Sequence, residues 1–363
     1  MPRTILSEDS LIRTIQRTVK SRGRVRFGIG DDAAVLKDGT VITTDAYAEG
    51  VHFDLSYMTL RQVGERCACG AISDVVAMAA EPEAVLVSLA LPAIRGRGSG
   101  DAGRGQARGV RDIVRELYKG IEGVCADMGC EVAGGDIIAA DRLLLALTVT
   151  GETRTPKLRS GAKPGDRLYV TGYLGSAEAG RIILAEEVRS QTAESTGRNR
   201  GSGQRKAGGG PRMGAGAWRA PLVRRHLRPV PRLGVMRVLK SRINGLIDTS
   251  DGLATDARHL GDMSRVRIVL EADVLPILPA TKRFCAERGR DPLGFVLEAG
   301  EDYELLFTGQ HRVPACVDCV RVTAIGRVEN GEGLWIEKSG RTLPVTVAGY
   351  DHLRVDRGGK TCW

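Results

Sequence analysis

The sequence predicts a mixed α/β (α+β) protein with two domains, and three observations support this prediction. The chain has 363 residues, whereas a typical domain has about 100–200. Helix-like stretches, with apolar residues at every third or fourth position, alternate along it with shorter strand-like stretches. A new turn-and-strand pattern, Ser-Gly-Ala-Lys-Pro-Gly-Asp, begins at residue 160. We therefore expect one domain at 1–152 and a second at 153–363.

In the first half, helix-like and strand-like stretches follow one another. Helices are predicted at 5–20, 59–80 and 110–129, and the second of them is rich in small residues. Strands are predicted at 24–30, 83–92, 130–136 and 142–152. Residues 34–47 have a hairpin pattern, because Asp38-Gly39 is a favoured two-residue turn. Layers of helices against strands are the expected architecture.

The second half repeats this mixture. A strand is predicted at 167–172 and a helix at 176–187. Residues 221–229 and 232–241 are helix-like, and 245–264 read as a short strand, an acidic turn and a helix. Further strand-rich stretches are expected at 266–276, 295–308 and 320–328.

The net charge of +9 comes from two Gly/Arg-rich segments, residues 94–111 and 188–220. Without them the chain has 41 basic and 42 acidic residues, so the rest of the protein is nearly neutral. Both segments lack an amphipathic period and are predicted to be flexible insertions. A basic protein can bind nucleic acid, but the larger segment contains a single aromatic residue, Trp218, for base stacking. The sequence therefore argues against a nucleic-acid partner.

The sequence also favours the cytoplasm. It has no run of about 18 apolar residues that could cross a membrane, and its start lacks the apolar stretch of a secretory signal. Its eight cysteines are too widely spread for a disulfide scaffold. Cys316 and Cys319 form a CxxC pattern without a second metal-binding pair at zinc-like spacing. Cys67 and Cys69 are interpreted as packing residues.

The positions of the acidic residues are the most informative feature. They follow apolar strands or lie in turns, where a carboxylate is costly unless it is paired. They are Asp31, Asp32, Asp45, Asp74, Asp136, Asp248, Asp251, Glu301 and Asp302. Few basic residues lie beside them, so Mg²⁺, which prefers oxygen ligands and bridges them to phosphates, is the expected partner. The alternative is that each single Asp is a turn residue or helix cap.

No Walker A loop or kinase-type glycine-rich loop is present. A phosphate site in this chain would therefore depend on metals held by carboxylates. Arg224, Arg225, His226 and Arg228 form a basic cluster that is either a phosphate site or a solvated helix end.

Nine motifs occur in an order and spacing that resemble the thiamine-monophosphate kinase family. They are GIGDDAAVL, TTDAYAEGVHF, SDVVAMAAEP, AGGD, RSGAKPGDRLYVTG, RRHLRPVPR, IDTSDGL, GEDYELLFT and GYDH. The resemblance covers nearly the whole chain outside the two insertions. It implies the two-domain fold of the aminoimidazole ribonucleotide synthetase-like superfamily and a homodimer in which the N-terminal domains share a barrel. It also implies ATP-dependent phosphorylation of thiamine monophosphate to thiamine diphosphate.

The resemblance also implies roles for individual residues. The magnesium positions correspond to Asp32, Thr43, Thr44, Asp45, Asp74, Asp136, Asp248 and Asp251. The ATP contacts correspond to Gly135, Asp136, Arg159 and Ser250, and the substrate contacts to His52 and Glu301. An aromatic residue near the C-terminus packs on the substrate in relatives. Val347 occupies that position here, and Tyr350 is the candidate replacement.

Two other motifs depart from the family pattern. Ala71-Ile72-Ser73-Asp74 stands where relatives often have Asn-Leu-Ser-Asp. Ile137-Ile138-Ala139 follows Gly-Gly-Asp where relatives often have Thr-Thr-Arg, which puts one phosphate contact in doubt.

The predicted reaction needs no general base. The second pKa of a phosphate ester is about 6, so the acceptor oxygen is largely ionised at neutral pH. Catalysis would consist of positioning and charge neutralisation, with the Asp residues as ligands.

Two alternatives remain. One is another ATP-using member of the superfamily, an aminoimidazole ribonucleotide or selenophosphate synthetase type. The selenophosphate type normally has a reactive residue near the N-terminus, whereas the first cysteine here is Cys67. The other alternative is an RNA-binding protein that acts through the Gly/Arg segments.

Overall fold

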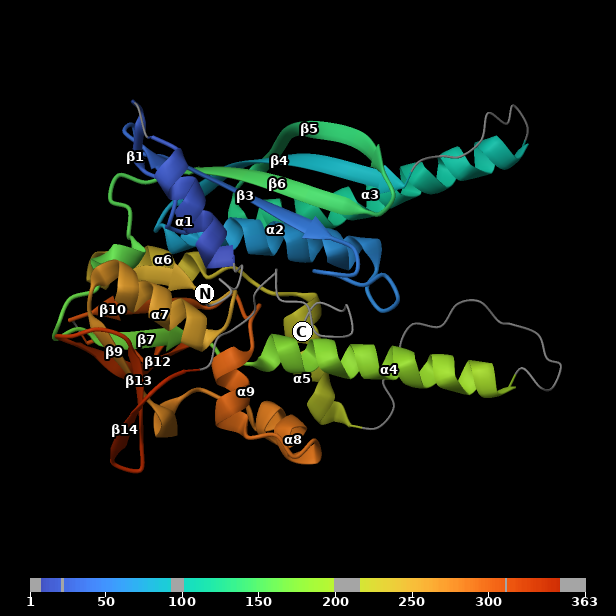
Figure 1. Cartoon of the computed structure of the whole chain (residues 1–363). Coiled ribbons are helices and arrows are strands. Elements are labelled where there is room, and N and C mark those ends of the chain that lie inside the picture. Colours follow the sequence, from blue (N-terminus) through green and yellow to red (C-terminus); the bar gives the residue numbers. More distant parts are fainter. Residues whose placement is uncertain (1–7, 21–22, 93–100, 199–215, 311, 347–363) are drawn as a thin grey trace, which may run out of the picture.

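The computed structural model describes residues 8–20, 23–92, 101–198, 216–310 and 312–346. These residues form a mixed α/β structure with two β-sheets and helical layers between and around them (Figure 1). The mixed architecture predicted from the sequence is confirmed. The first sheet is built from residues of the N-terminal half and the second from residues after 166.

The first sheet has six strands and is antiparallel except for one pair. In spatial order its strands are β1 (Val25–Phe27), β2 (Ala34–Leu36), β3 (Thr40–Ala48), β6 (Leu144–Glu152), β4 (Glu81–Pro92) and β5 (Glu131–Ala140). β4 and β5 are parallel and are joined by the helix α3 (Asp101–Met128), as a crossover connection requires.

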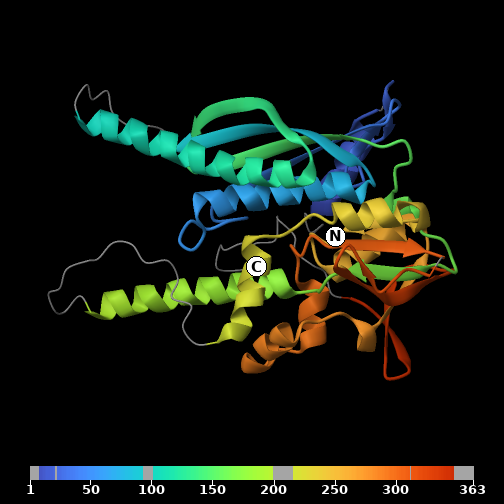
Figure 2. The same ribbon diagram turned by 180° about the vertical axis from the view of Figure 1, so that it is seen from behind.

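The helices α2 (Leu60–Ala77) and α3 cover one face of this sheet, as Figure 2 shows from behind. The small residues of α2 allow a close helix–helix contact. A Cβ on Gly64 would lie 2.1 Å from the carbonyl oxygen of Leu117 in α3, and one on Gly120 would lie 2.1 Å from that of Arg61. α2 begins with a capping box in which Thr59 and Gln62 bond each other's backbone N–H groups. α2 therefore forms a rigid layer under the sheet.

The second sheet is antiparallel except for the pair β13 and β9. In spatial order its strands are β14 (Arg341–Pro344), β13 (Leu334–Lys338), β9 (Arg267–Glu271), β12 (Val320–Glu329), β7 (Arg167–Thr171), β10 (Leu305–Gly309) and β8 (Leu246–Asp248), and β11 (Cys316–Val317) pairs with β12. The surrounding helices are α4 (Ser176–Arg198), α5 (Ala220–Leu227), α6 (Leu233–Leu239), α7 (Leu253–Ser264), α8 (Pro279–Glu287) and α9 (Pro292–Glu298).

α2 lies between the two sheets and connects their cores. One continuous apolar cluster contains Ile72 of α2, Leu147 of the first sheet and Met236 of α6, all of which are fully buried. Polar contacts add to this packing: Ser73 of α2 donates a hydrogen bond to Asp248 at the end of β8 (2.6 Å). The two halves of the chain therefore hold each other in a fixed orientation across α2.

The edge strand β5 carries exposed apolar side chains. Ile137 is 59% exposed and Ile138 is 58% exposed, and Leu86 of the neighbouring β4 is 40% exposed. Figure 1 shows α2 and α3 on one face of this sheet, with β5 at its edge. β5 pairs with β4 along its inner side, so its outer edge is open in the described structure. The exposed apolar patch (Leu86, Ile137 and Ile138) lies on this edge strand and its neighbour β4.

The prediction of two wholly flexible insertions was wrong in part. α3 begins at Asp101, inside the first segment, and α4 continues to Arg198, well past Glu187, where the sequence predicted its end. Arg, Gln, Ala and Glu are good helix formers, and they outweigh the scattered glycines once a helix has started. Residues 93–100 and 199–215 of these segments lie outside the described residues.

The end of the second segment is also ordered. Trp218 packs against the core of the second half, and its ring lies 4.9 Å from the guanidinium of Arg283. Two shorter elements also differ from the prediction. Residues 295–298, expected to be strand-rich, belong to α9, which Pro292 and the Asp291 cap start. The helix α8 was not predicted. No helix in the described ranges is long and apolar enough to cross a membrane.

Candidate functional site

A cavity of about 1490 Å³ lies between the first sheet and the helices of the second half. Its walls come from the N-terminal helix α1 (Glu8–Thr18), the loop after β1, the strand β3, the turn after β8, α7, and the loop after α9. Most of the acidic residues singled out in the sequence meet here. The lining includes Asp31, Asp32, Thr43, Thr44, Asp45, His52, Asp74, Arg159, Ser250, Asp251 and Glu301.

Three carboxylates from distant parts of the chain form the centre of the site. Asp32, Asp74 and Asp248 each offer an oxygen, and these atoms lie within 4.8 Å of one another. Asp32 comes from the loop after β1, Asp74 from α2, and Asp248 from the end of β8. The site therefore depends on the packing of α2 against both halves. The resemblance placed these three residues among the magnesium positions, and the structure brings their carboxylates together.

Neighbouring hydroxyl groups orient two of these carboxylates. Thr43 donates a hydrogen bond to Asp74 (2.8 Å), and Ser73 donates one to Asp248 (2.6 Å). Arg159 contacts one oxygen of Asp32 (2.8 Å). The other oxygen of Asp32, Oδ2, is buried and has no hydrogen-bond partner. A buried carboxylate oxygen without a partner is costly, which indicates that a cation belongs beside it.

Burial and mutual repulsion raise the pKa values of Asp31, Asp74 and Asp248. The pKa of Asp248 rises to about 7, first because the group is buried and then because of the nearby Asp32 charge. Burial, together with Asp45 and Asp248, raises the pKa of Asp74 well above its usual value. Burial and the adjacent Asp32 raise the pKa of Asp31 to about 6. Such a group of acids favours either bound protons or a bound cation.

The donor set fits a hard divalent cation. All three members of the cluster are carboxylates, and one of them, Asp32, has a buried oxygen, Oδ2, without a hydrogen-bond partner. Oxygen ligands at a site without sulfur or imidazole suit Mg²⁺. Asp45 lines the same cavity, and the hydroxyl of Tyr47 donates a hydrogen bond to its Oδ2 (2.7 Å).

The structure does not bring all predicted site residues together. Gly135 and Asp136 lie on β5, and neither lines the cavity. Gly135 is in register with Asp45 across the sheet, but β6 and β4 lie between them. Three strand spacings of about 4.8 Å separate them. Within one chain, Asp136 is therefore too far from Asp45 for the two carboxylates to bind the same metal ion.

Three other predicted site residues are Thr44, Tyr350 and His52. Thr44 lines the cavity, and its hydroxyl accepts a hydrogen bond from Thr148 of β6 (3.1 Å). Tyr350 and Val347 lie outside the described residues. His52 lines the cavity, and its Nδ1 accepts a hydrogen bond from the backbone N–H of Ala48 (3.1 Å).

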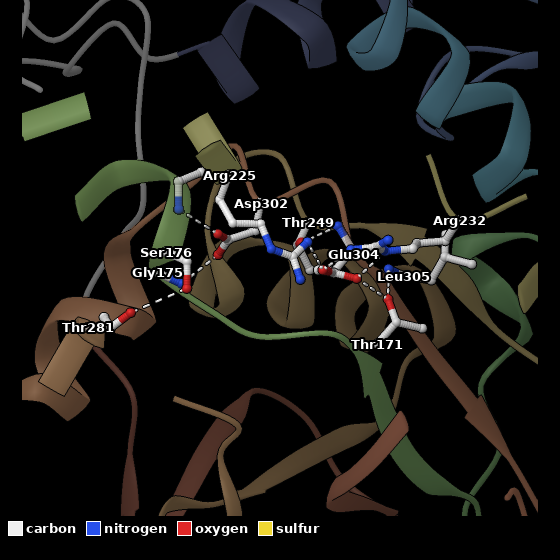
Figure 3. Close-up of polar contacts among 11 residues, drawn as sticks. Thr171, Gly175, Ser176, Arg225, Arg232, Thr249, Thr281, Asp302, Glu304 and Leu305 are labelled. Carbon is white, nitrogen blue, oxygen red and sulfur yellow. Dashed lines mark hydrogen bonds and ion pairs between the residues drawn. The ribbon is translucent and has the colours of Figure 1, made fainter. Parts of the chain in front are cut away.

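The predicted basic cluster is largely structural. Arg225 and Arg232 both bind the fully buried Glu304, at 2.9 Å and 2.5 Å (Figure 3). His226 is fully buried, and Arg228 lies 3.4 Å from Glu65. A phosphate site formed by the whole cluster is thus not supported, because Arg225 is paired with Glu304 and His226 is buried, whereas only Arg224 and Arg228 are exposed. Arg232 was missed, since its sequence surroundings resemble an ordinary helix start.

The motif Gly-Glu-Asp-Tyr-Glu has structural members as well as cavity-lining ones. Asp302 accepts hydrogen bonds from the backbone N–H groups of Gly175 (2.5 Å) and Ala177 (3.1 Å), at the start of α4 (Figure 3). It therefore acts as a helix cap. Burial raises the pKa of Asp302 to about 7 despite these bonds. Glu301 and Tyr303 instead line the cavity.

Comparison with known proteins places the chain in one family. Residues 30–153 match the model of the AIR synthase related protein, N-terminal domain. The thiamine-monophosphate kinase of Aquifex aeolicus is 32% identical over 340 residues, which cover 92% of this chain and 94% of the relative. That of Bacillus subtilis is 29% identical over 356 residues, which cover 95% of this chain and 91% of the relative.

Solved structures agree with this placement. The structure of AaThiL complexed with AMPPCP and TMP is 30% identical, with a TM-score of 0.75, and the match covers 97% of this chain and 99% of that one. The hydrogenase maturation protein HypE in complex with ATP shares the fold at 16% identity and a TM-score of 0.59. The motifs, the fold and the relatives of this length together show that the chain belongs to the thiamine-monophosphate kinase family.

Proposed function

We propose that this protein transfers the γ-phosphoryl group of ATP to thiamine monophosphate and so forms thiamine diphosphate. The observation that carries the proposal is the group of three converging carboxylates, which includes the unpartnered oxygen of Asp32. Two of its members, Asp32 and Asp74, line the large cavity, and the buried Asp248 lies next to them. A relative 30% identical to it has been solved with AMPPCP and TMP bound. ATP as donor also favours the cytoplasm as its location.

The acidic residues act in this proposal as metal ligands. Asp32, Asp74 and Asp248 form the first set, and Asp45 and Asp251 line the same cavity. Mg²⁺ bound there would neutralise the phosphate charges and orient the γ-phosphate for in-line attack. Thr43 and Ser73 keep the carboxylates of Asp74 and Asp248 in place by donating hydrogen bonds to them.

Arg159 provides positive charge on the nucleotide side of the site. Its guanidinium lies 2.8 Å from Asp32, and its backbone N–H donates to Asp31 (3.2 Å). Ser250 lines the cavity beside Asp251. His52 and Glu301, on the walls formed by the loop after β3 and the loop after α9, are proposed to bind the acceptor. These assignments follow the resemblance, and the cavity lining supports them.

A test of the substrate uses a panel of acceptors in an ADP-release assay. Thiamine monophosphate is expected to stimulate ADP formation, and free thiamine is expected to be inactive. An aminoimidazole ribonucleotide precursor is included because the superfamily contains that activity. Stimulation by the precursor or by free thiamine instead of thiamine monophosphate would refute the proposed substrate.

We further propose a homodimer that completes the site and is built through the first domain, residues 1–152, with the second domain at 153–363. Asp136 cannot reach the cavity of its own chain, because three strand spacings separate its strand from β3. Two residues of the exposed apolar patch, Ile137 and Ile138, follow Asp136 on the edge strand β5, and Leu86 lies on the neighbouring β4. Pairing of two such edges into a shared barrel would bury this patch and bring Asp136 to the partner's cavity.

Mixing two inactive variants tests this arrangement. Asp136→Ala and Asp74→Ala are each expected to abolish most turnover. After unfolding and refolding of an equal mixture, half of the dimers are mixed, and each has one site with both Asp residues. Activity of about one quarter of the wild-type value is therefore expected. If Asp136 acted within its own chain, the mixture would be as inactive as its components. A wild-type mass of 38.9 kDa in light scattering would contradict the dimer itself.

The raised pKa values of the clustered carboxylates predict that Mg²⁺ binding depends on pH. Asp248, with a pKa of about 7, holds a proton at pH 6 in the metal-free protein, and a cation must displace it. Mg²⁺ affinity should therefore rise about tenfold between pH 6 and pH 8 for one displaced proton. Calorimetric titration at the two pH values measures this change. In Asp248→Asn the pH dependence should become smaller but persist, because the pKa of Asp74 is also raised. Equal affinity at both pH values in the wild type would refute the displacement.

A further inference from the structure

The geometry points to Arg66 as a residue that positions Glu301, and through it the acceptor; this inference rests on the function proposed above. Arg66 lies on α2, and its side chain is 1% exposed. Its Nη2 is 2.5 Å from Oε2 of Glu301, and its Nη1 donates a hydrogen bond to the backbone oxygen of His226 (2.6 Å). A buried arginine is retained only where its charge has partners.

These contacts join three parts of the molecule. α2 carries Arg66, the end of α5 provides the carbonyl of His226, and the loop after α9 carries Glu301. The guanidinium also lies 5.9 Å from the ring centre of Tyr303 in the same loop. A second contact fixes α2 against the same region, because Cys69 donates a hydrogen bond to the backbone oxygen of Pro229 (3.1 Å). The side chain of Arg66 is therefore held in place, and its guanidinium positions the Glu301 carboxylate through the ion pair.

The loop that carries Glu301 has a constrained backbone. Glu301 has a φ of +63°, which is unfavourable for a residue with a side chain. Its N–H donates to the backbone oxygen of Ser250 (2.8 Å) in the acidic turn. A Cβ on the preceding Gly300 would lie 2.4 Å from that same oxygen, so glycine is needed there. The backbone is thus fixed by the acidic turn, and the carboxylate is fixed by Arg66.

The positive charge of the acceptor explains why a carboxylate held by Arg66 would matter for its binding. The thiazolium ring of thiamine monophosphate carries a permanent positive charge, which a carboxylate attracts. Glu301 is partly exposed at 19% and lines the cavity, so it can meet such a cation while Arg66 holds it from the other side. Asp32 and Arg159, which are proposed for the nucleotide side, belong to other segments of the chain than Arg66 and Glu301. Loss of Arg66 should therefore weaken acceptor binding selectively.

The experiment compares Arg66→Met and Arg66→Lys with the wild-type enzyme. In Arg66→Met we expect the KM for thiamine monophosphate to rise about tenfold or more, because Glu301 loses its buried ionic partner. The KM for ATP should stay within about twofold. Arg66→Lys keeps the charge but cannot hold both partners, so an intermediate rise is expected. Calorimetric binding of AMPPCP and of thiamine monophosphate, each measured without turnover, should show the same split.

Arg225→Met is the matched control. It also removes an arginine from a carboxylate in this region, but Glu304 does not line the cavity and retains Arg232 (Figure 3). It should leave the KM for thiamine monophosphate nearly unchanged. In a Glu301→Gln background, Arg66→Met should add little to the loss of acceptor affinity.

Three results would overturn the inference. They are an unchanged acceptor KM in folded Arg66→Met, an equal rise in both KM values, and full additivity with Glu301→Gln. If Arg66→Met fails to fold, as shown by circular dichroism, Arg66→Lys decides by the same criteria. Wild-type turnover of thiamine monophosphate in the same assay reports on the proposed function separately.

Discussion

Replacing Asp74 by Asn is expected to reduce kcat by about 10²- to 10³-fold while the fold is retained. The amide has the shape of the carboxylate, so the hydroxyl of Thr43 can still donate a hydrogen bond to its oxygen. The charge, however, is lost at the centre of the three-carboxylate cluster. Steady-state kinetics at several Mg²⁺ concentrations should show the loss of turnover together with weaker metal activation.

Asp38→Asn is the control for this substitution. Asp38 is also an aspartate of the first half, but it pairs with Arg24 at the surface, and its side chain is 45% exposed. It does not line the cavity, so this variant should retain normal turnover. Near-normal kcat in Asp74→Asn at saturating Mg²⁺ would contradict the role of Asp74 as a ligand.

Replacing Glu304 by Gln is expected to cause the largest loss of stability, about 3–5 kcal/mol. Glu304 is fully buried and binds Arg232 through both of its oxygens, at 2.5 and 2.6 Å. Thr171 donates a further hydrogen bond to it (2.5 Å), as Figure 3 shows. Glutamine cannot neutralise Arg232, whose side chain is 8% exposed, so an uncompensated charge would stay buried. Urea unfolding measures the change in the free energy of unfolding.

The matched control for Glu304 is Glu81→Gln. Glu81 forms an ion pair with Arg237 at 2.6 Å, but the side chains of Glu81 and Arg237 are 46% and 55% exposed. Solvent can replace such a pair, and a loss below about 1 kcal/mol is expected. If Glu304→Gln were no more destabilising than Glu81→Gln, the buried network would not have the structural role assigned to it.

The sequence predicted the candidate metal ligands better than the buried arginines that hold the surrounding structure in place. Asp32, Asp74 and Asp248 were identifiable because they are acids among apolar or small residues and match the magnesium positions of the family. Their convergence followed from the resemblance. Arg66 and Arg232 were not identified, because a single arginine in a helical pattern looks the same whether it faces solvent or is buried. Their partners, Glu301 and Glu304, lie more than 70 residues away in the chain, which no local pattern reveals.

The fold shows the same division. The order of strands and helices was largely predictable from apolar periodicity, whereas α8 and α9 were missed because both are short and flanked by prolines and arginines. The helical parts of the Gly/Arg-rich segments were not predicted. Their glycine content suggested flexibility, whereas a helix that has already started can continue through such residues. The distance of Asp136 from the cavity could not be predicted at all, since it depends on strand order in the sheet.

The most direct test of the central claim follows both phosphoryl donor and acceptor in one sample by ³¹P NMR. With the wild-type protein, ATP, Mg²⁺ and thiamine monophosphate, the signals of ATP should decrease as those of thiamine diphosphate and ADP increase in equal amounts. Removal of Mg²⁺ with EDTA should stop the reaction, and Asp74→Asn should slow it by the factor given above. Hydrolysis of ATP to ADP and free phosphate without thiamine diphosphate, or a reaction unaffected by EDTA, would contradict a metal-dependent transfer between the two bound phosphates.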